Sequence, residues 1–343
     1  MSRVAELCKE FKKDFSPKVK DPTKPVSCWS EKDLLENKVE NSFVIIFRTK
    51  GCKWALESGC SMCGYFNDSL FNDITEDELK AQFDSVMNKY KNEKIVKIFT
   101  SGSFLDDQEI SKKLQDEIII KLDETADKIS VESRPEFITK EKLSSIKNNL
   151  KNSIFEVGIG LETASDYIRE NAVNKGFTYK DYLNSVKNLK KFEMKIKTYV
   201  LIKPLFLTEK ESINDCIDTV KKIKNLTDVI SFNPTNAQRK TLVEYLWKRH
   251  YYRPPWLWSV EEILKKSKQI YDGVIKCDVV GGGSARGANN CNNCNKDILK
   301  QITDFSLSQN INVFSDIICD CKEKWLDQID LEKLTFGSIV DFS

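Results

Sequence analysis

The chain has 343 residues, of which 40% are hydrophobic and 31% charged, and its formal net charge is +2. This length can form one large domain with an appendage, or two domains, and so small a net charge gives no sign of nucleic-acid binding through bulk charge. No apolar run approaches the roughly 20 residues that span a bilayer, and the N-terminus, MSRVAELCKEFKKDF, lacks an apolar signal core. We therefore expect a cytoplasmic protein without a membrane partner.

Strand-like and helix-like segments alternate through the middle of the chain. Residues 1–40, rich in lysine, are predicted to form an N-terminal extension made of a helix and an extended arm. Residues 41–235 are predicted to form the core, since six β-rich runs alternate there with amphipathic segments. These runs are 43–48, 95–101, 128–132, 154–160, 196–203 and 229–233. Such alternation favours right-handed parallel βα units, in an open sheet or in a full or partial barrel.

Two of the helical segments carry a start signal. Thr75 with Glu78, and Thr208 with Glu211, have the spacing of a capping box. After residue 235 the alternation stops, and residues 236–343 are predicted to form a C-terminal region with an aromatic and basic segment followed by a zinc site.

Three cysteines stand close together after the first predicted strand. Cys52, Cys60 and Cys63 follow the apolar run 42–47, and no histidine lies nearby to complete a zinc site. Clustered thiolates hold zinc or an iron–sulfur cluster. Three thiolates on a four-iron cluster leave one iron without a protein ligand, and an open position is typical of a reactive metal site. The loop also stands where parallel βα folds place their chemistry, at the carboxyl end of a strand.

With the aromatic Tyr65 just behind them, these cysteines resemble the cluster loop of the radical S-adenosylmethionine (SAM) superfamily. Seven residues separate Cys52 from Cys60, which departs from the superfamily's commonest CxxxCxxC spacing and resembles the subgroup that includes the Elongator-type tRNA-modifying enzymes. The alternative is a zinc knuckle or unrelated thiols. The resemblance implies a 4Fe-4S cluster, SAM, and an α/β fold with a partial (βα)6 barrel, preceded by the N-terminal extension and followed by a cysteine-rich, metal-stapled region.

Small or charged residues end the next three predicted strands. They are Ser101, Gly102, Ser103, Glu132, Arg134, Gly160 and Glu162. Small residues let backbone carbonyls approach an ammonium group, a carboxylate accepts hydrogen bonds from ribose hydroxyls, and an arginine pairs with a carboxylate. Together with Tyr65, the set resembles the superfamily's SAM-binding positions, which implies methionyl contacts at 101–103 and Arg134, ribose contacts at Glu132 and adenine contacts around Gly160 and Glu162. The alternatives are plain strand-to-helix turns and surface ion pairs.

An aromatic and basic segment follows the core. Lys248, Arg249 and Arg253 stand close to Trp256 and other rings. Cations neutralise phosphates and rings stack an unpaired base, so the segment predicts RNA contacts at these four residues. The alternative is that the rings belong to the core and the charges are solvated. The N-terminal lysines are predicted to add phosphate contacts, and they are Lys12, Lys13, Lys18 and Lys20.

The second cysteine group is typical of a metal site. Cys291 and Cys294 have CxxC spacing, and Cys319 and Cys321 form a Cys-x-Cys pair. Four thiolates make a closed tetrahedral zinc site, with Cys277 in place of one of them as a further possibility. A second iron–sulfur cluster is the alternative, because four-thiolate sites serve both metals.

The C-terminal motifs resemble one family, the archaeosine-biosynthesis radical SAM proteins (RaSEA). The resemblance runs from about residue 26 to the end, through the segment 233–258, Cys277-Asp-Val-Val-Gly-Gly-Gly-Ser-Ala-Arg-Gly287 and Cys291-Asn-Asn-Cys294. It implies a radical SAM lyase acting on archaeal tRNA. In that family a partner synthase adds lysine to the nitrile of 7-cyano-7-deazaguanine at position 15, and the radical SAM protein cleaves the lysine-derived C–N bond, through a 5′-deoxyadenosyl radical, to form archaeosine.

The expected partners are therefore tRNA, the archaeosine synthase partner, and an electron donor such as a ferredoxin or flavodoxin. No further catalytic residue is assigned from the sequence. The alternative functions are another tRNA-modifying radical SAM enzyme, of the methylthiotransferase or carboxymethyl type, and a non-catalytic RNA-binding metalloprotein.

Overall fold

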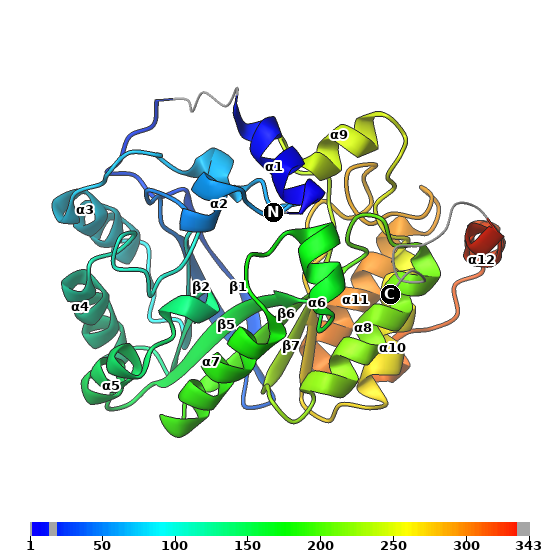
Figure 1. The fold of residues 1–343 in the computed structure, drawn as a ribbon. Helices are drawn as coiled ribbons and strands as arrows, with labels where there is room; N and C mark the ends of the chain where they lie inside the picture. Colours follow the sequence, from blue (N-terminus) through cyan, green and yellow to red (C-terminus); the bar gives the residue numbers. More distant parts are fainter. Residues whose placement is uncertain (1, 14–18, 335–343) are drawn as a thin grey trace.

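The computed structural model describes residues 2–13 and 19–334. Eight strands form one sheet in the order β1 to β8 (Figure 1). The strands are β1 Ser27–Leu35, β2 Lys38–Ile46, β3 Ile95–Phe99, β4 Lys128–Glu132, β5 Ile154–Glu162, β6 Lys195–Ile202, β7 Val229–Pro234 and β8 Val274–Cys277. β1 and β2 form an antiparallel hairpin, and all pairs from β2 to β8 are parallel. The predicted α/β partial barrel is confirmed.

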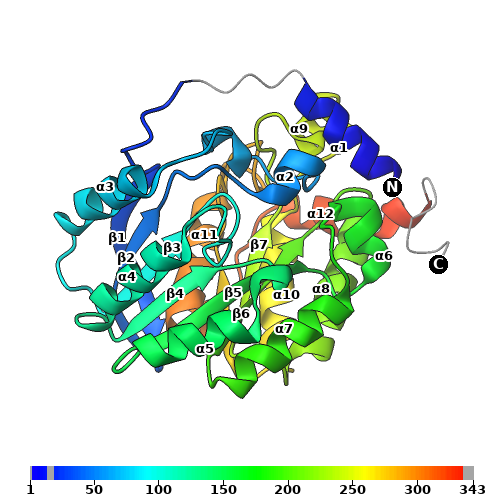
Figure 2. The same cartoon turned by 60° about the vertical axis from the view of Figure 1, so that its left-hand side comes forward.

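Between β2 and β8 helices connect successive parallel strands, while α1 precedes the sheet and α11 and α12 follow it. The helices are α1 Arg3–Lys13, α2 Lys53–Glu57, α3 Glu76–Met87, α4 Lys112–Asp123, α5 Lys140–Asn149, α6 Asp166–Ile168, α7 Tyr179–Lys191, α8 Glu209–Ile223, α9 Leu242–Lys248, α10 Leu257–Lys268, α11 Asn295–Ser308 and α12 Cys321–Leu331. Both predicted capping boxes are present, at the starts of α3 and α8. Figure 2 shows α4, α5 and α7 lying along the outer side of the sheet.

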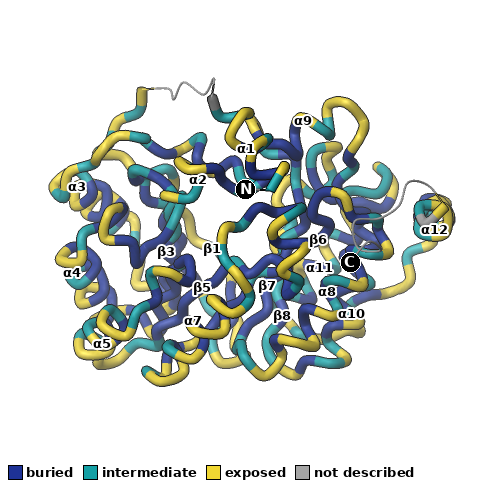
Figure 3. The backbone as a smooth tube through the Cα atoms, in the orientation of Figure 1, coloured by how far each residue is buried: buried dark blue, intermediate teal, exposed yellow. Residues whose placement is uncertain are grey.

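The main hydrophobic core lies between the sheet and this helical layer. Strand alternation sends Ile129 and Val131 of β4 outward into that core, where both are fully buried. The burial pattern of Figure 3 follows this arrangement, with buried backbone in the strands and exposed backbone on the outermost helical surfaces. The other side of each strand therefore faces the interior of the partial barrel.

The sheet has two more strands than the six that the sequence predicts. Part of the expected N-terminal arm is β1, and β8 lies in the segment where no further strand was expected. The predicted segments 1–40, 41–235 and 236–343 thus all contribute to one sheet. In the part of the chain that the structure describes, no helix is long and apolar enough to cross a membrane.

Candidate active site and metal centre

The first cysteine group lies on the loop after β2, at the carboxyl edge of the sheet. Cys52 stands at the N-terminus of α2, and Cys60 and Cys63 follow that helix. All three thiols are half-exposed, and none forms a disulfide. Burial raises the pKa of Cys63 to about 12, and the charges of Cys60 and Cys52 act in the same direction. The three sulfurs are therefore close electrostatic neighbours.

These three cysteines are not part of a compact group of metal ligands among the described residues. A four-thiolate zinc site has Zn–S bonds of about 2.3 Å, so its sulfurs lie within about 4 Å of one another. Among the described residues, the C-terminal group alone brings three or more ligand atoms within 4.8 Å of one another. Three free thiols on one loop, outside that group, fit a cluster in which each cysteine binds a different iron.

Helix α1 covers this loop and places a cation inside it. The Lys12 ammonium donates hydrogen bonds to the carbonyls of Ala55 at 3.1 Å and Ser58 at 3.0 Å, and lies 4.8 Å from the Phe66 ring centroid. Gly59 has a φ of +83°, and a Cβ there would collide with the Lys12 ammonium. Lys12 is thus hydrogen-bonded inside the loop, and its contact with RNA stays a prediction. Lys18 and the side chain of Lys13 lie outside the described residues.

The turn after β3 contacts the same loop. Ser101 donates a hydrogen bond to the Tyr65 carbonyl at 3.2 Å, and a Cβ on Gly102 would lie 2.7 Å from the Cys52 Cα. Beneath the turn, Glu109 accepts hydrogen bonds from the Ser103 amide and the Thr49 hydroxyl, both at 2.7 Å. Burial raises the pKa of Glu109 to about 7. This carboxyl therefore fixes the turn against the cysteine loop.

The ends of β4 and β5 bring the predicted charged residues to this edge. The Arg134 side chain is buried, donates to Glu136 and the Lys175 carbonyl, and lies 5.7 Å from the Trp54 ring. Its charge lowers the pKa of Cys52, against the larger effect of burial. Arg134 therefore lies on the cluster side of the sheet.

A buried ion pair joins the end of β5 to the cysteine loop. Glu162 has a φ of +68°, at a bulge in β5, and pairs with Lys175 at 2.5 Å. A Cβ on Gly160 would collide with the same lysine. Burial lowers the pKa of Lys175, but Glu162 and then Cys60 outweigh that effect and raise it.

Tyr65 connects the loop to the mouth of the barrel. Burial raises its pKa to about 12, and the charges of Cys63, Glu132 and Asp278 reinforce the shift. Glu132 is hydrogen-bonded to Tyr199 of β6, and burial raises the pKa of its carboxyl. The phenol thus faces two carboxylates from opposite parts of the sheet.

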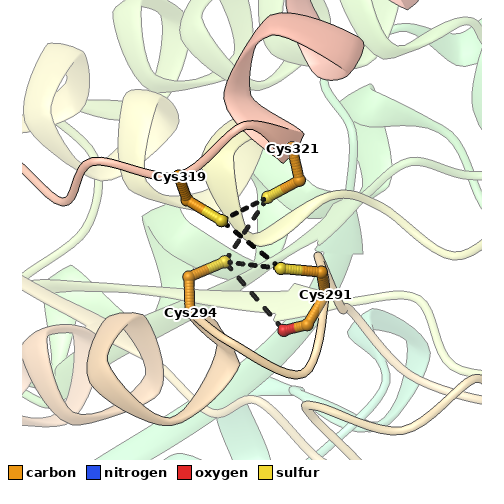
Figure 4. A group of neighbouring side chains, drawn as sticks. All are labelled: Cys291, Cys294, Cys319 and Cys321. Atoms are coloured by element: carbon orange, nitrogen blue, oxygen red, sulfur yellow. Dashed lines mark hydrogen bonds between the residues drawn. The ribbon is translucent and has the colours of Figure 1, made fainter.

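The second cysteine group forms a compact four-sulfur site. Figure 4 shows Cys291 and Cys294, before α11, pointing toward Cys319 and Cys321 at the start of α12. The S···S distances are 3.6 Å for 291–294, 3.4 Å for 291–319, 3.5 Å for 294–321 and 3.4 Å for 319–321. A tetrahedral zinc–thiolate site has S···S edges of about 3.8 Å. The four thiols could therefore hold one metal ion, and Cys277 is not part of the group.

The surroundings of this site act differently on the individual thiols. The Trp258 indole N–H donates to the Cys321 sulfur at 3.3 Å. Burial opposes ionisation of Cys291, but hydrogen bonds from Cys319 and other neighbours outweigh it and lower its pKa to about 7. Burial raises the pKa of Cys294 and that of Cys321, and the neighbouring sulfurs reinforce the shift at Cys321. Metal ligands must be deprotonated, so a bound metal ion would have to displace these protons.

The aromatic and basic segment is only partly on the surface. Lys248 and Arg249 are exposed, and the Arg249 guanidinium lies 3.6 Å from the Tyr245 ring. Trp256 is buried, and its indole donates to Gln328 at 2.7 Å. Arg253 lies over the Trp256 ring and donates to two backbone carbonyls. The first two residues are thus accessible to a large ligand, while the other two belong to the packing beneath.

Comparison with known proteins identifies the family. The profile of the radical SAM superfamily matches residues 46–220, which include the cysteine loop and strands β3 to β6. The chain belongs to the radical SAM superfamily. It also belongs with two curated relatives named archaeosine synthase subunit beta. The relative from Methanosarcina acetivorans is 38% identical over 96% of this chain and 96% of its own length. The one from Thermococcus kodakarensis is 33% identical over 87% of this chain and 94% of its own length.

One solved structure is similar to this chain at a low level. The crystal structure of methylornithine synthase covers 99% of this chain and 90% of its own chain, with 11% identity and a TM-score of 0.48. The family assignment depends on the sequence matches and not on this structure.

A radical SAM enzyme uses a 4Fe-4S cluster and SAM, and the site fits both groups. The loop supplies three free thiols, so one iron of a four-iron cluster would have no cysteine ligand. The turn 101–103 and Arg134 lie next to the loop. The sequence predicted these residues, but it missed Lys12, Glu109 and Lys175. They are remote in sequence from their partners, and ordinary Lys and Glu residues carry no local signal.

The Glu109 contacts give a testable result for this radical SAM enzyme. Glu109→Gln is expected to retain SAM binding, because glutamine can accept from the Ser103 amide and donate to Thr49. Glu109→Ala leaves a buried amide unsatisfied, which costs about 1–3 kcal/mol, and SAM affinity should fall with it. Calorimetric SAM titration of both reconstituted variants measures this, and equal loss in the two would contradict the role of Glu109 as an acceptor.

Proposed function

We propose that this radical SAM enzyme forms archaeosine in tRNA by cleaving the C–N bond between a lysine substituent and the amidine of a modified 7-deazaguanine at position 15. The observation that carries the proposal is the three-thiol loop at the carboxyl edge of the sheet, in a chain matched over 96% of its length by an archaeosine synthase subunit beta. The other tRNA-modifying radical SAM enzymes considered from the sequence would also need the three-cysteine loop. The similarity over nearly the whole chain favours archaeosine formation over them.

The cofactor contacts follow from the geometry of the site. Cys52, Cys60 and Cys63 would hold the cluster. When bound, the reduced cluster and SAM together supply a 5′-deoxyadenosyl radical that removes a hydrogen atom from the substrate. Tyr65 and the predicted strand-end residues would orient SAM, and these are Ser101, Gly102, Ser103, Glu132, Arg134, Gly160 and Glu162. No described residue accepts a hydrogen bond from Nη2 of Arg134, which supports its proposed pairing with the methionyl carboxylate.

The C-terminal group would bind zinc. The four sulfurs lie within 4.8 Å of one another, which suits one tetrahedral ion. A four-iron cluster needs its ligands spread over separate irons, as in the first group. The metal would tie the start of α11 to the start of α12, because each helix begins next to one cysteine pair.

The partners follow from the reaction. A one-electron donor such as a ferredoxin or flavodoxin would reduce the cluster, and a synthase subunit would supply the lysine-bearing tRNA. We propose that exposed cations near α9 contact the phosphates, with Lys248 and Arg249 at the surface and Arg253 and Trp256 supporting them.

The RNA contact predicts a specific salt dependence. Each phosphate contact contributes a slope of about −0.9 to log K against log salt on duplex and about −0.7 on single strands. Lys248→Ala combined with Arg249→Ala should weaken tRNA binding and flatten the slope by about 1.4 to 1.8, while SAM cleavage without tRNA persists. The matched control is Lys180→Ala with Lys187→Ala, two exposed lysines on α7. Equal slopes for the two double variants would place the RNA path elsewhere.

The proposed function is tested by nucleoside analysis of tRNA. Cells lacking this protein should accumulate a lysine-bearing 7-deazaguanosine and lose archaeosine, as measured by mass spectrometry. Normal archaeosine in those cells would remove the proposal.

A further inference from the structure

The cation inside the cysteine loop has no carboxylate partner among the described residues. The Lys12 ammonium donates hydrogen bonds to the backbone carbonyls of Ala55 and Ser58, and the Phe66 ring lies beside it. A lysine ammonium has three donors, so one N–H is left without an acceptor in the described part of the chain. A charge removed from water is costly unless it is paired. The place of Lys12 therefore suits an anionic neighbour.

Helix α1 holds Lys12 in this place through contacts of its own with the loop. The Ser58 hydroxyl donates to the Ala5 carbonyl at 3.0 Å. Val4 and Cys8 are buried in a small hydrophobic cluster against which Met62, between two of the loop cysteines, also packs. Both Figure 1 and Figure 2 show α1 beside α9 and above the loop that carries α2. Since α1 lies outside residues 46–220, which match the superfamily, this cation comes from the N-terminal extension and not from the shared core.

The ammonium lies against the backbone next to Cys60. A Cβ on Gly59 would overlap the Lys12 ammonium, and consecutive Cα atoms are 3.80 Å apart, so Nζ lies within about 7 Å of the Cys60 Cα. Gly59 has a φ of +83°, which glycine adopts without strain, and its missing side chain leaves room for the ammonium. Burial lowers the pKa of Lys12, and the charges of Cys60 and then Cys63 are the largest effects that oppose this shift.

Two other cations near the cysteines already have carboxylate partners. Lys175 pairs with Glu162, and Arg134 pairs with Glu136. Their charges are therefore largely compensated by the protein itself. The charge of Lys12 is not, and it is held by backbone carbonyls that carry no net charge.

We propose that Lys12 is the counter-ion of the reduced 4Fe-4S cluster and raises the reduction potential of that cluster. Reduction transfers one electron from the donor, and so adds one negative charge to the cluster and its three thiolates. An ammonium beside them stabilises the added charge, since cluster potentials depend on net charge and on hydrogen bonds to the sulfurs. A larger fraction of the cluster is then reduced at the potential of a given donor. This role concerns the cluster alone and does not depend on the proposed tRNA substrate.

The test compares Lys12→Gln with Lys12→Arg in the reconstituted full-length protein, without SAM or tRNA. Both side chains can donate to the two carbonyls, but only arginine keeps the charge. At an effective dielectric constant of about 20, a unit charge about 12 Å away changes a one-electron equilibrium about tenfold, which is about 59 mV. Lys12→Gln should therefore lower the midpoint potential by about 59 mV or more, and Lys12→Arg should keep the parental value. Electron paramagnetic resonance of the reduced cluster at controlled potentials measures both.

The matched control is Lys9→Gln, which removes the charge of an exposed lysine one turn earlier on α1. Solvent and salt screen that charge, so this variant should keep the parental potential. Iron and sulfide per chain show whether each variant carries a full cluster. A parental potential for fully loaded Lys12→Gln would overturn the inference and leave Lys12 to the predicted RNA contact. An equal shift in Lys9→Gln would also overturn it.

Cluster content decides the case in which a variant does not load. Loss of the cluster in Lys12→Gln and Lys12→Arg alike would overturn the inference, because Lys12 would then hold the loop by its shape and not act through its charge. Loss in Lys12→Gln alone would support it, since the charge kept by arginine would be what the cluster needs.

Nucleoside analysis of tRNA separates this role from the proposed function. If cells lacking the protein keep archaeosine while Lys12→Gln lowers the potential, the proposed function fails and the counter-ion remains. If those cells lose archaeosine while loaded Lys12→Gln keeps the parental potential, the counter-ion alone fails.

Discussion

Replacement of Cys52, Cys60 or Cys63 by alanine is expected to abolish the cluster and the cleavage of SAM. Each thiolate is proposed to hold a separate iron, because a radical SAM enzyme binds its four-iron cluster through three cysteines. No described cysteine is a spare ligand in the loop between them. Removal of one therefore leaves an iron without a protein ligand, and the cluster should be lost. Iron and sulfide per chain, and 5′-deoxyadenosine formed under reducing conditions, measure the result, which should fall to background.

The matched control for these variants is Cys28→Ala. Cys28 is half-exposed like the loop cysteines but lies on β1, so this variant should keep both the cluster and SAM cleavage. A loop variant that retains SAM cleavage would contradict the assignment of all three cysteines.

The sequence predicted the strands whose outer faces are apolar and missed those whose character is set by the barrel interior. Val96 and Ile98 of β3 pack against helices, and this pattern is visible in the sequence. In β1, Glu31 and Asp33 pair with lysines of other strands. These charges made the segment look like a polar extended arm in the sequence. The four-residue strand β8 contains Lys276, which pairs with Asp33. Charged residues on the inner face of a strand thus replace the apolar residues on which strand prediction depends.

The same reasoning explains which parts of the site could be found. Both cysteine groups are visible because cysteines with short spacings are rare and chemically specific. Lys12 reaches the carbonyls of Ala55 and Ser58 across 43 and 46 residues, and the tertiary fold alone creates that contact. Trp256 carries an aromatic signal, but its environment, buried with the indole donating to Gln328, depends on the packing of α12.

Cys291→Ala is expected to remove the C-terminal metal and to destabilise the protein. Zinc in a structural site contributes an apparent binding free energy of about 10–16 kcal/mol near pH 7, so loss of one of four thiolates should cost several kcal/mol of that stabilisation. The effect should reach beyond the site, because Trp258 of α10 donates to Cys321 and Trp325 of α12 donates to Ser259. Zinc per chain and the temperature of thermal unfolding measure the outcome, and both should fall.

The control and the decisive comparison concern the identity of the metal. Cys277→Ala should keep its zinc, since Cys277 is not part of the four-sulfur group. A variant lacking all three loop cysteines should also keep one zinc per chain, because the two metal groups lie in separate parts of the fold. Iron and sulfide in that triple variant would establish a second cluster in place of zinc. Unchanged zinc content and stability in Cys291→Ala would show that these four sulfurs, although they lie within 4.8 Å of one another, hold no structural metal.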